Sequence, residues 1–313
     1  MTQYSILNKF ELLEILELYS ISEIKSYEIL SGGSENTNYK IDTEFGIIVL
    51  TISEQKTIEE AQNLTRLLDY LKRQNFSTSE LLQTAQNKSL SIFNNKPVMI
   101  KKFIAGKTMS NLPTHLLEQI GADVARLHKI SPPYYLRDVM WCGKERFSEV
   151  EKYALNSSFD IWLKDILLYV SQYITPDLPK AFIHSDIFDS NIIVNHNETK
   201  ATIMDFEEAT YYFRIFDIAM LFIGLCVENK SINFSRASSI LKGYTNNMQL
   251  TEKEIQVLQP FTVYAAAGVA FWRHKNFNHV MPDESLKDTY LEMRDLADFV
   301  RALTASQFNI LRP

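Results

Sequence analysis

One stretch near the middle of the chain carries the residues best suited to chemistry. It spans residues 182–194 and reads FIHSDIFDSNIIV, and Asp205-Phe206 follows at the end of the next apolar run. Asp186 stands five positions before Asn191, and Asp205 comes fourteen residues after Asn191. Phosphoryl transfer from ATP needs one carboxylate to orient a hydroxyl and accept its proton, and oxygen ligands that hold magnesium on the phosphates. Asp186 suits the first role, and Asn191 and Asp205 suit the second.

Each of these residues also has an ordinary structural interpretation. Asp186 and Asp189 are residue types that cap turns, and Asn191 is typical of the end of a loop. The ordered pattern H-x-D-x-x-x-x-N-I-I-V, followed by I-M-D-F, is far more specific than any one of its members. The whole pattern therefore favours the catalytic interpretation.

The segments before residue 103 predict a β-rich domain that includes an amphipathic helix. Apolar positions between residues 56 and 74 recur at helical spacing, and residues 31–36 have the composition of a turn. A short helix is expected at 10–20. Strands are expected at about 27–30, 38–41, 46–52, 90–93 and 98–103.

Beyond residue 110 the pattern is mainly helical, with one β-hairpin built from 192–194 and 201–204. Helices are expected at 114–130, 159–173, 214–228, 232–246, 252–277 and 283–304. These patterns predict an α+β chain with two lobes, and a length of 313 residues suits two domains. The predicted N-lobe is small and β-rich and spans 1–103; the predicted C-lobe is larger and mainly helical and spans 104–313.

Composition and charge exclude several classes of protein. With 46% hydrophobic and 22% charged residues the chain can bury a core, and its net charge of −6 argues against a nucleic-acid or anionic-membrane partner. The longest apolar run, 218–227, is about half of a membrane span. Cys142 and Cys226 are too few for a disulfide framework or a cysteine-based zinc site. Glutamates interrupt the first apolar stretch, unlike a secretion signal. We expect a soluble, cytoplasmic protein.

The pattern resembles the aminoglycoside phosphotransferase/choline kinase branch of the protein-kinase-like fold. That branch has a histidine, here His184, ahead of the catalytic aspartate, and Asp-Phe at the second metal site. Within the branch, the sequence is most similar to the bacterial homoserine kinase type, from about Tyr27 to about Ala302. The likeness includes residues 33–39 (GSENTNY), 49–51 (VLT), 127–128 (LH), 216–219 (FDIA) and 271–273 (FWR).

The resemblance implies an enzyme that uses ATP and Mg²⁺ to phosphorylate an alcohol hydroxyl of a small molecule. It also implies that His184 and Asp217 support the catalytic loop, and that backbone groups contact the nucleotide. A Gly-Gly turn alone is typical of an ordinary hairpin, but its place before a strand pair and a helix favours a loop that covers phosphates. The implied nucleotide contacts are Gly32, Gly33, Ser34, Asn36 and Thr51, and, in the link between the lobes, Lys102, Phe103 and Ile104.

One position departs from the superfamily pattern. Most members present a lysine on the third strand, which contacts the ATP phosphates and pairs with a helix glutamate. Thr51 stands at the matching position, and the homoserine kinase group is similar in having threonine there. Phosphate neutralisation is therefore unassigned. Lys56 and Lys40 are candidates, with ordinary surface lysines as the alternative, and Glu59 and Glu60 have no assigned partner.

Charge type distinguishes the possible acceptors. Choline or ethanolamine needs an aromatic or acidic cage, and an aminoglycoside needs several carboxylates. Homoserine carries a carboxylate and an ammonium group, and Arg273 beside Trp272 suits the carboxylate. Alternatively, Arg273, His274 and Lys275 complement a helix C-terminus. Glu207 resembles the Asp-Phe-Glu of choline kinases and is a further acceptor-site candidate. L-Homoserine is the favoured acceptor; choline, ethanolamine and aminoglycosides are alternatives.

Two other classes of protein are alternatives to a small-molecule kinase. A nucleotide-binding pseudokinase is suggested by Thr51, but the complete set of Asp186, Asn191 and Asp205 argues against it. A protein kinase is excluded, because no Ala-Pro-Glu motif follows Asp205 and the chain leaves no room for an activation segment. The oligomeric state stays open.

Overall fold

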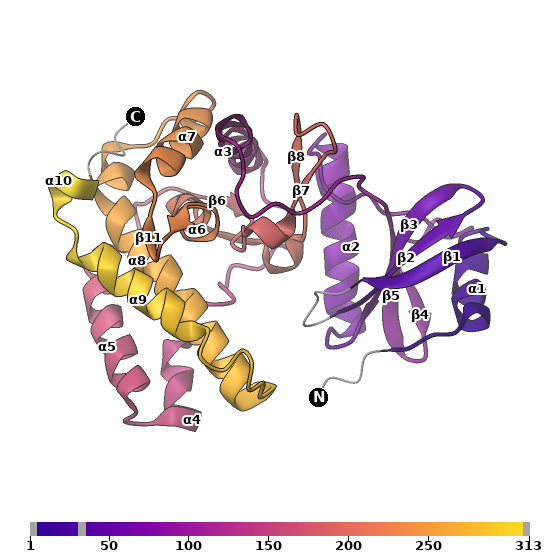
Figure 1. Ribbon diagram of the computed structural model, residues 1–313, viewed down its shortest axis with the longest axis horizontal. Coiled ribbons are helices and arrows are strands. Elements are labelled where there is room, and N and C mark those ends of the chain that lie inside the picture. Colours follow the sequence, from indigo (N-terminus) through magenta and orange to yellow (C-terminus); the bar gives the residue numbers. More distant parts are fainter. Residues whose placement is uncertain (1–4, 31–35, 309–313) are drawn as a thin grey trace. The chain divides into compact units, whose positions relative to one another are not determined.

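The structure, a computed structural model, describes residues 5–30 and 36–308 of the 313-residue chain. The chain forms two compact units (Figure 1): unit 1 contains Met1–Ala105 and Met204–Glu207, and unit 2 contains Gly106–Ile203 and Glu208–Pro313. The predicted boundaries, 1–103 and 104–313, place the segment Met204–Glu207 with the C-lobe, whereas its contacts place it in unit 1.

Unit 1 is built on a five-stranded antiparallel sheet with the strand order β1-β2-β3-β5-β4. Alternate residues of β2 are buried, which is the period-two pattern of a strand with one face on a core. The unit also contains the helices α1 (Lys9–Glu17) and α2 (Ile58–Arg73). The strands are β1 (Ile24–Leu30), β2 (Asn36–Thr43), β3 (Gly46–Ser53), β4 (Ser91–Phe93) and β5 (Lys96–Lys102).

The two faces of this sheet differ in chemistry. One face packs on α1 through an apolar cluster that includes Leu12, Tyr39 and Leu50. The alternation of β2 puts Asn36 and Asn38 on the opposite face, where their cross-strand partners are Ser53 and Thr51. Polar side chains at neighbouring positions of paired strands therefore line one face of the sheet.

Unit 2 is mainly helical, and α6 is its central element. Nearly every residue of α6 is buried, and the helix packs against α8, while α3 packs against α7 and α8 against α9 (Figure 1). A helix that is apolar all round needs such complete enclosure. The helices are α3 (Thr114–Lys129), α4 (Glu151–Ala154), α5 (Ser158–Ser171), α6 (Arg214–Leu225), α7 (Phe234–Thr245), α8 (Glu252–Lys275), α9 (Tyr290–Ala302) and α10 (Ala305–Phe308).

The mixed α+β class is as predicted, but the prediction of a single hairpin in the second half was wrong. Only the β7–β8 hairpin was foreseen. The β6–β9 pair joins segments far apart in the sequence, and β10 and β11 are short, so neither pair leaves a clear local pattern. The strands are β6 (Lys180–Ile183), β7 (Ile192–Val194), β8 (Ala201–Ile203), β9 (Thr210–Phe213), β10 (Val227–Glu228) and β11 (Ser231–Ile232).

One predicted helix begins later than expected, and one helical stretch is unusually long and apolar. The helix expected from 283 begins at Tyr290, because hydrogen-bonded turns around Asp283 occupy the preceding residues.

Among the described residues, one helical stretch, Glu252–Val280, is long and apolar enough to cross a membrane by composition. Its most apolar 18-residue window is 78% buried inside the protein, and a helix in the core of a folded protein has the same property.

Candidate active site

The loop that carries Asp186 is closed by a side chain from its own far end. Asn191, in a short 3-10 turn (Asp189–Asn191), donates through Nδ2 to the main-chain oxygen of Asp186 at 2.9 Å and to its Oδ2 at 3.1 Å. The Oδ1 atom of Asn191 accepts no hydrogen bond from the residues that the structure describes. An amide oxygen left available in this way is a suitable magnesium ligand.

Asp217, in the first turn of α6, fixes the backbone just before Asp186. Its Oδ2 accepts the main-chain N–H of His184 at 2.8 Å, and its Oδ1 accepts that of Ser185 at 2.6 Å. Asp217 is completely buried, and His128 Nε2 lies 3.1 Å from Oδ2. Ser185 has φ +68°, an uncommon value for a residue other than glycine, so these bonds hold a strained conformation directly before Asp186.

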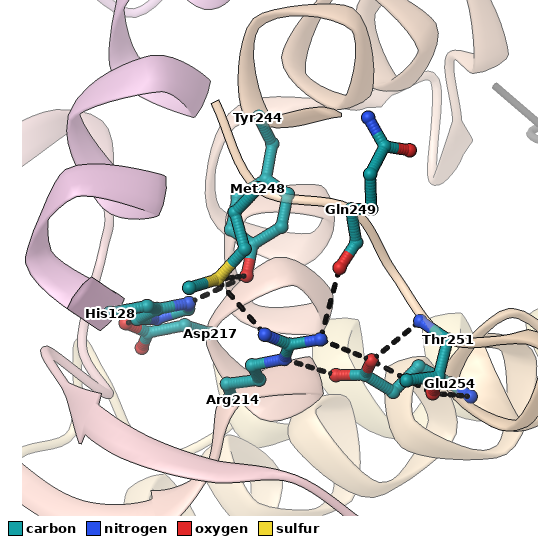
Figure 2. A network of polar contacts seen from close by, with 8 residues as sticks. All are labelled: His128, Arg214, Asp217, Tyr244, Met248, Gln249, Thr251 and Glu254. Atoms are coloured by element: carbon teal, nitrogen blue, oxygen red, sulfur yellow. Dashed lines mark hydrogen bonds and ion pairs between the residues drawn. The ribbon is translucent and has the colours of Figure 1, made fainter. Parts of the chain in front are cut away.

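The same network reaches three further helices (Figure 2). His128 Nδ1 lies 2.9 Å from the Tyr244 hydroxyl, which donates to Met248 Sδ at 3.3 Å, and Arg214 Nη1 also donates to this sulfur. Arg214 then forms a two-bond ion pair with Glu254, each bond 2.6 Å long. The hydrogen bonds to Glu254 raise the pKa of Arg214. Helices α3, α7 and α8 are thus linked to Asp217 through His128.

Two further close contacts involve the backbone of the loop that carries Asp186. A Cβ atom on Gly224 would lie 2.0 Å from the main-chain oxygen of Ile187, so α6 approaches the catalytic loop as closely as only glycine allows. The N–H of Asp186 donates to His184 Nδ1 at 3.3 Å, and His184 is buried. The contacts of His184 and Asp217 are those of residues that support the loop.

Aromatic and basic groups lie on the same unit near Asp186. Trp141 Nε1 donates to the main-chain oxygen of Ser185 at 3.3 Å, and its ring packs edge-on against Trp272 at 5.7 Å. Arg273 Nη1 donates to Thr289 O at 3.1 Å and to Glu292 at 3.3 Å. Burial lowers the pKa of Arg273, while the charges of Glu292 and Asp186 act in the opposite direction. Trp141 was not found from the sequence, because no motif marks it.

The helix-dipole alternative for the three basic residues at the end of α8 receives limited support. Burial, together with His279, lowers the pKa of His274 to about 4, so its imidazole is neutral near pH 7 and adds no charge to the helix end. Lys275 pairs with Glu149 at 2.6 Å. Arg273, by contrast, has no hydrogen-bond partner for Nε or Nη2 within 5–30 and 36–308. Two nitrogen atoms of its guanidinium group therefore have no protein acceptor in this part of the chain.

Some of the nucleotide-binding residues predicted in unit 1 lie outside the described residues, and Thr51 lies inside them. Gly32, Gly33 and Ser34 lie outside the described residues. Thr51 is completely buried, and its hydroxyl donates to Asn38 Oδ1 at 2.8 Å. The structure thus turns the threonine at the usual lysine position toward its cross-strand neighbour.

The three predicted adenine contacts, Lys102, Phe103 and Ile104, differ in whether their backbone N–H groups already have an acceptor. The N–H of Lys102 donates to Glu80 O at 2.8 Å, and that of Phe103 donates to Ile47 O at 3.4 Å. The N–H of Ile104 has no acceptor among the residues described here. Ile104 is therefore the main-chain donor of this segment that an adenine ring can still use.

Glu207 has a set of contacts in unit 1 that the sequence did not predict. Its Oε2 forms an ion pair with Lys56 Nζ at 2.9 Å, and its Oε1 accepts a hydrogen bond from Asn36 Nδ2 at 2.9 Å. Asp205, two positions earlier, has φ +63°. Glu60 forms the capping box of α2 with Thr57. The acceptor contact predicted for Glu207 stays a prediction.

The metal ligands are also predictions from the motif. Within the described residues, no group of three or more His, Cys, Asp and Glu side chains gathers to hold a metal ion. Magnesium does not require such a cage, because it usually keeps several waters and binds one or two carboxylates together with substrate phosphates. The oxygen donors of Asn191 and Asp205 fit that requirement.

Comparison with known proteins identifies the family. The model of the phosphotransferase enzyme family matches residues 26–237, more than half of the chain. A homoserine kinase of Rhizobium meliloti is 24% identical over 266 residues, which covers 82% of this chain and 81% of that protein. A homoserine kinase of Nitrobacter winogradskyi is 24% identical over 305 residues, with coverage of 95% and 92%.

Solved structures show the same fold. A microcompartment-associated aminopropanol kinase superposes with a TM-score of 0.74 at 14% identity, covering 97% of this chain and 99% of that one. Spectinomycin phosphotransferase, solved with ADP and spectinomycin, gives 0.72 at 16% identity, with coverage of 96% and 100%. The catalytic motif, the fold and the matched relatives agree, and they overrule the pseudokinase alternative. This chain is a phosphotransferase enzyme that belongs to the phosphotransferase enzyme family and has a protein-kinase-like fold.

Proposed function

We propose that this phosphotransferase transfers the γ-phosphoryl group of Mg–ATP to the hydroxyl group of L-homoserine. The observation that carries phosphoryl transfer is the closed loop in which Asn191 holds Asp186 while keeping its own amide oxygen available. The relatives named homoserine kinase, matched over most of their length, support the choice of acceptor.

In the proposed reaction Asp186 does the work at the acceptor. Its carboxylate orients the hydroxyl group and accepts its proton as the oxygen attacks the γ-phosphorus. Asn191 Oδ1 and the carboxylate of Asp205 would hold magnesium, which supplies charge neutralisation on the phosphates. Asp217 keeps the loop backbone in place, so the Asp186 carboxylate needs no reorganisation during the reaction.

Arg273 is the proposed site for the carboxylate of homoserine. Its Nε and Nη2 donors are the pair of a guanidinium that binds a carboxylate through two parallel hydrogen bonds. Arg273 lies on the same unit as Asp186, and the carboxylate charge of Asp186 acts to raise the pKa of Arg273.

Choline or ethanolamine is the second candidate acceptor. The edge-on pair of Trp141 and Trp272, beside the main chain of Ser185, offers aromatic surface to a cationic ligand. A cation without a carboxylate would leave Arg273 unused, and for this reason we propose homoserine ahead of choline or ethanolamine.

The test measures ADP release from Mg–ATP with L-homoserine, choline, ethanolamine and an aminoglycoside, each offered separately. We expect turnover that depends on homoserine, with phosphohomoserine identified by mass spectrometry. Turnover with choline or ethanolamine alone would replace the acceptor and keep the reaction. If a protein that unfolds cooperatively, and is therefore folded, releases no ADP with any of these acceptors, the proposed substrates are wrong.

Arg273→Lys is expected to raise KM for homoserine about ten- to hundredfold, with a smaller change in kcat, because a lysine cannot form the two-bond carboxylate contact. Steady-state kinetics with homoserine as the varied substrate measure this effect. Arg294→Lys, on the surface of α9 beside Asp295, is the matched control and should leave both constants unchanged. Equal KM values for Arg273→Lys and the parent protein would remove Arg273 from the acceptor site.

A further inference from the structure

We propose that Lys56 is the cation that neutralises the nucleotide phosphates, in place of the lysine that Thr51 replaces. The inference rests on the proposed function, because it assigns a residue to the ATP site of that reaction. The hydroxyl of Thr51 is buried and bonded to Asn38, so this residue supplies no positive charge to a phosphate. Besides magnesium, positive charge from the protein would have to come from a neighbouring side chain.

Lys56 is the lysine of unit 1 that the structure ties to the metal-site motif. Its ammonium pairs with Glu207, two positions after Asp205, and the two side chains are only 14% and 10% exposed. Removing two charges from water is costly, and such a pair is a weak source of stability. A buried pair beside Asp205 is instead what phosphate binding requires, namely a positioned ammonium close to the predicted magnesium ligand.

Two buried polar side chains near the Lys56–Glu207 pair have atoms without a hydrogen-bond partner in the described residues. Asn36 donates to Glu207 through Nδ2, while its Oδ1 is buried and has no hydrogen-bond partner in the described part of the chain. Ser53, the cross-strand partner of Asn36, is 1% exposed, and its Oγ is likewise buried and unpartnered there. Buried polar atoms without partners are rare in folded proteins. A hydroxyl that can donate and an amide oxygen that can accept suit a hydrated triphosphate.

Two other lysines of unit 1, Lys40 and Lys102, form ion pairs that are more exposed than the Lys56–Glu207 pair. Lys40 pairs with Glu28, and these side chains are 33% and 62% exposed. Lys102 pairs with Glu80 on the surface, with 59% and 43% exposure. In this proposal Glu207 takes the part of the helix glutamate, and Lys56 takes the part of the strand lysine.

The test separates recognition of phosphate from recognition of the nucleoside. Isothermal titration compares Mg–ATP and adenosine as ligands of the parent protein, Glu207→Gln and the double variant Lys56→Met/Glu207→Gln, which removes both charges of the pair. We expect the double variant to lose about ten- to hundredfold in affinity for Mg–ATP and to bind adenosine as the parent does. Glu207→Gln keeps the ammonium and should lose less than the double variant. Lys40→Met is the matched control and should bind both ligands normally.

The outcomes distinguish this inference from the proposed function. Failure of the parent protein to bind Mg–ATP would overturn both. Binding by the parent together with equal ATP affinity in the double variant would overturn the role of Lys56 and leave the reaction intact. Equal losses of ATP and adenosine would show a purely structural pair and would also overturn it.

A measurement on the unmodified protein covers the case in which the double variant does not fold. Amine acylation followed by mass spectrometry reports how fast each lysine reacts. Mg–ATP should slow the reaction of Lys56 and leave Lys40 unchanged, whereas adenosine should affect neither residue. Unchanged reactivity of Lys56 at saturating Mg–ATP would overturn the proposal.

Discussion

Asp186→Ala is expected to lower kcat by about 10²- to 10⁴-fold, the usual contribution of a positioned general base. The affinity for Mg–ATP should stay close to that of the parent protein, because Asp186 is assigned to the acceptor hydroxyl. The loop should persist, since Asn191 also bonds the main-chain oxygen of Asp186 at 2.9 Å. Steady-state kinetics and nucleotide titration on the same preparation check both expectations.

Asp189→Ala is the control for that experiment. Asp189 belongs to the same loop and begins its 3-10 turn, so its replacement removes a nearby carboxylate and leaves Asp186 in place. The control variant should keep most of the parent kcat. A near-parental kcat in Asp186→Ala would remove the base from the mechanism, and loss of Mg–ATP binding in that variant would move the residue to the nucleotide site.

Asp217→Asn is expected to lower the free energy of unfolding by about 3 kcal/mol and to reduce kcat as well. The carboxylate accepts hydrogen bonds at both oxygens, from His184 N–H and Ser185 N–H, in a completely buried position. The amide keeps one acceptor and turns a donor toward an N–H group. The loop before Asp186 therefore loses a bond that holds Ser185 at φ +68°.

Urea unfolding and steady-state kinetics together test this role of Asp217. A positioning role predicts that kcat falls in the fraction that remains folded, with KM for ATP little changed. Asp295→Asn, on the exposed side of α9, is the control and should match the parent in both measurements. Reduced stability with an unchanged kcat of the folded protein would restrict Asp217 to a structural role.

The sequence by itself determined the chemistry and the class of fold. Asp186, Asn191 and Asp205 could be predicted as site residues because they stand close together along the chain, at a spacing that matches the loop and metal-site motif of kinase-like enzymes. The apolar periodicities likewise predicted the main helices and the N-terminal sheet, because those elements are stabilised by patterns within one segment.

Only the tertiary structure decided which residues hold and complete the site. Lys56 meets Glu207, and Arg214 meets Glu254, across long separations in sequence. Trp141 reaches Ser185 in the same way. Such contacts leave no local periodicity or spacing, because the partners are brought together by the packing of whole elements. The same packing turns Thr51 toward Asn38 and leaves two donors of Arg273 open, since burial and hydrogen-bond saturation are properties of the folded chain alone.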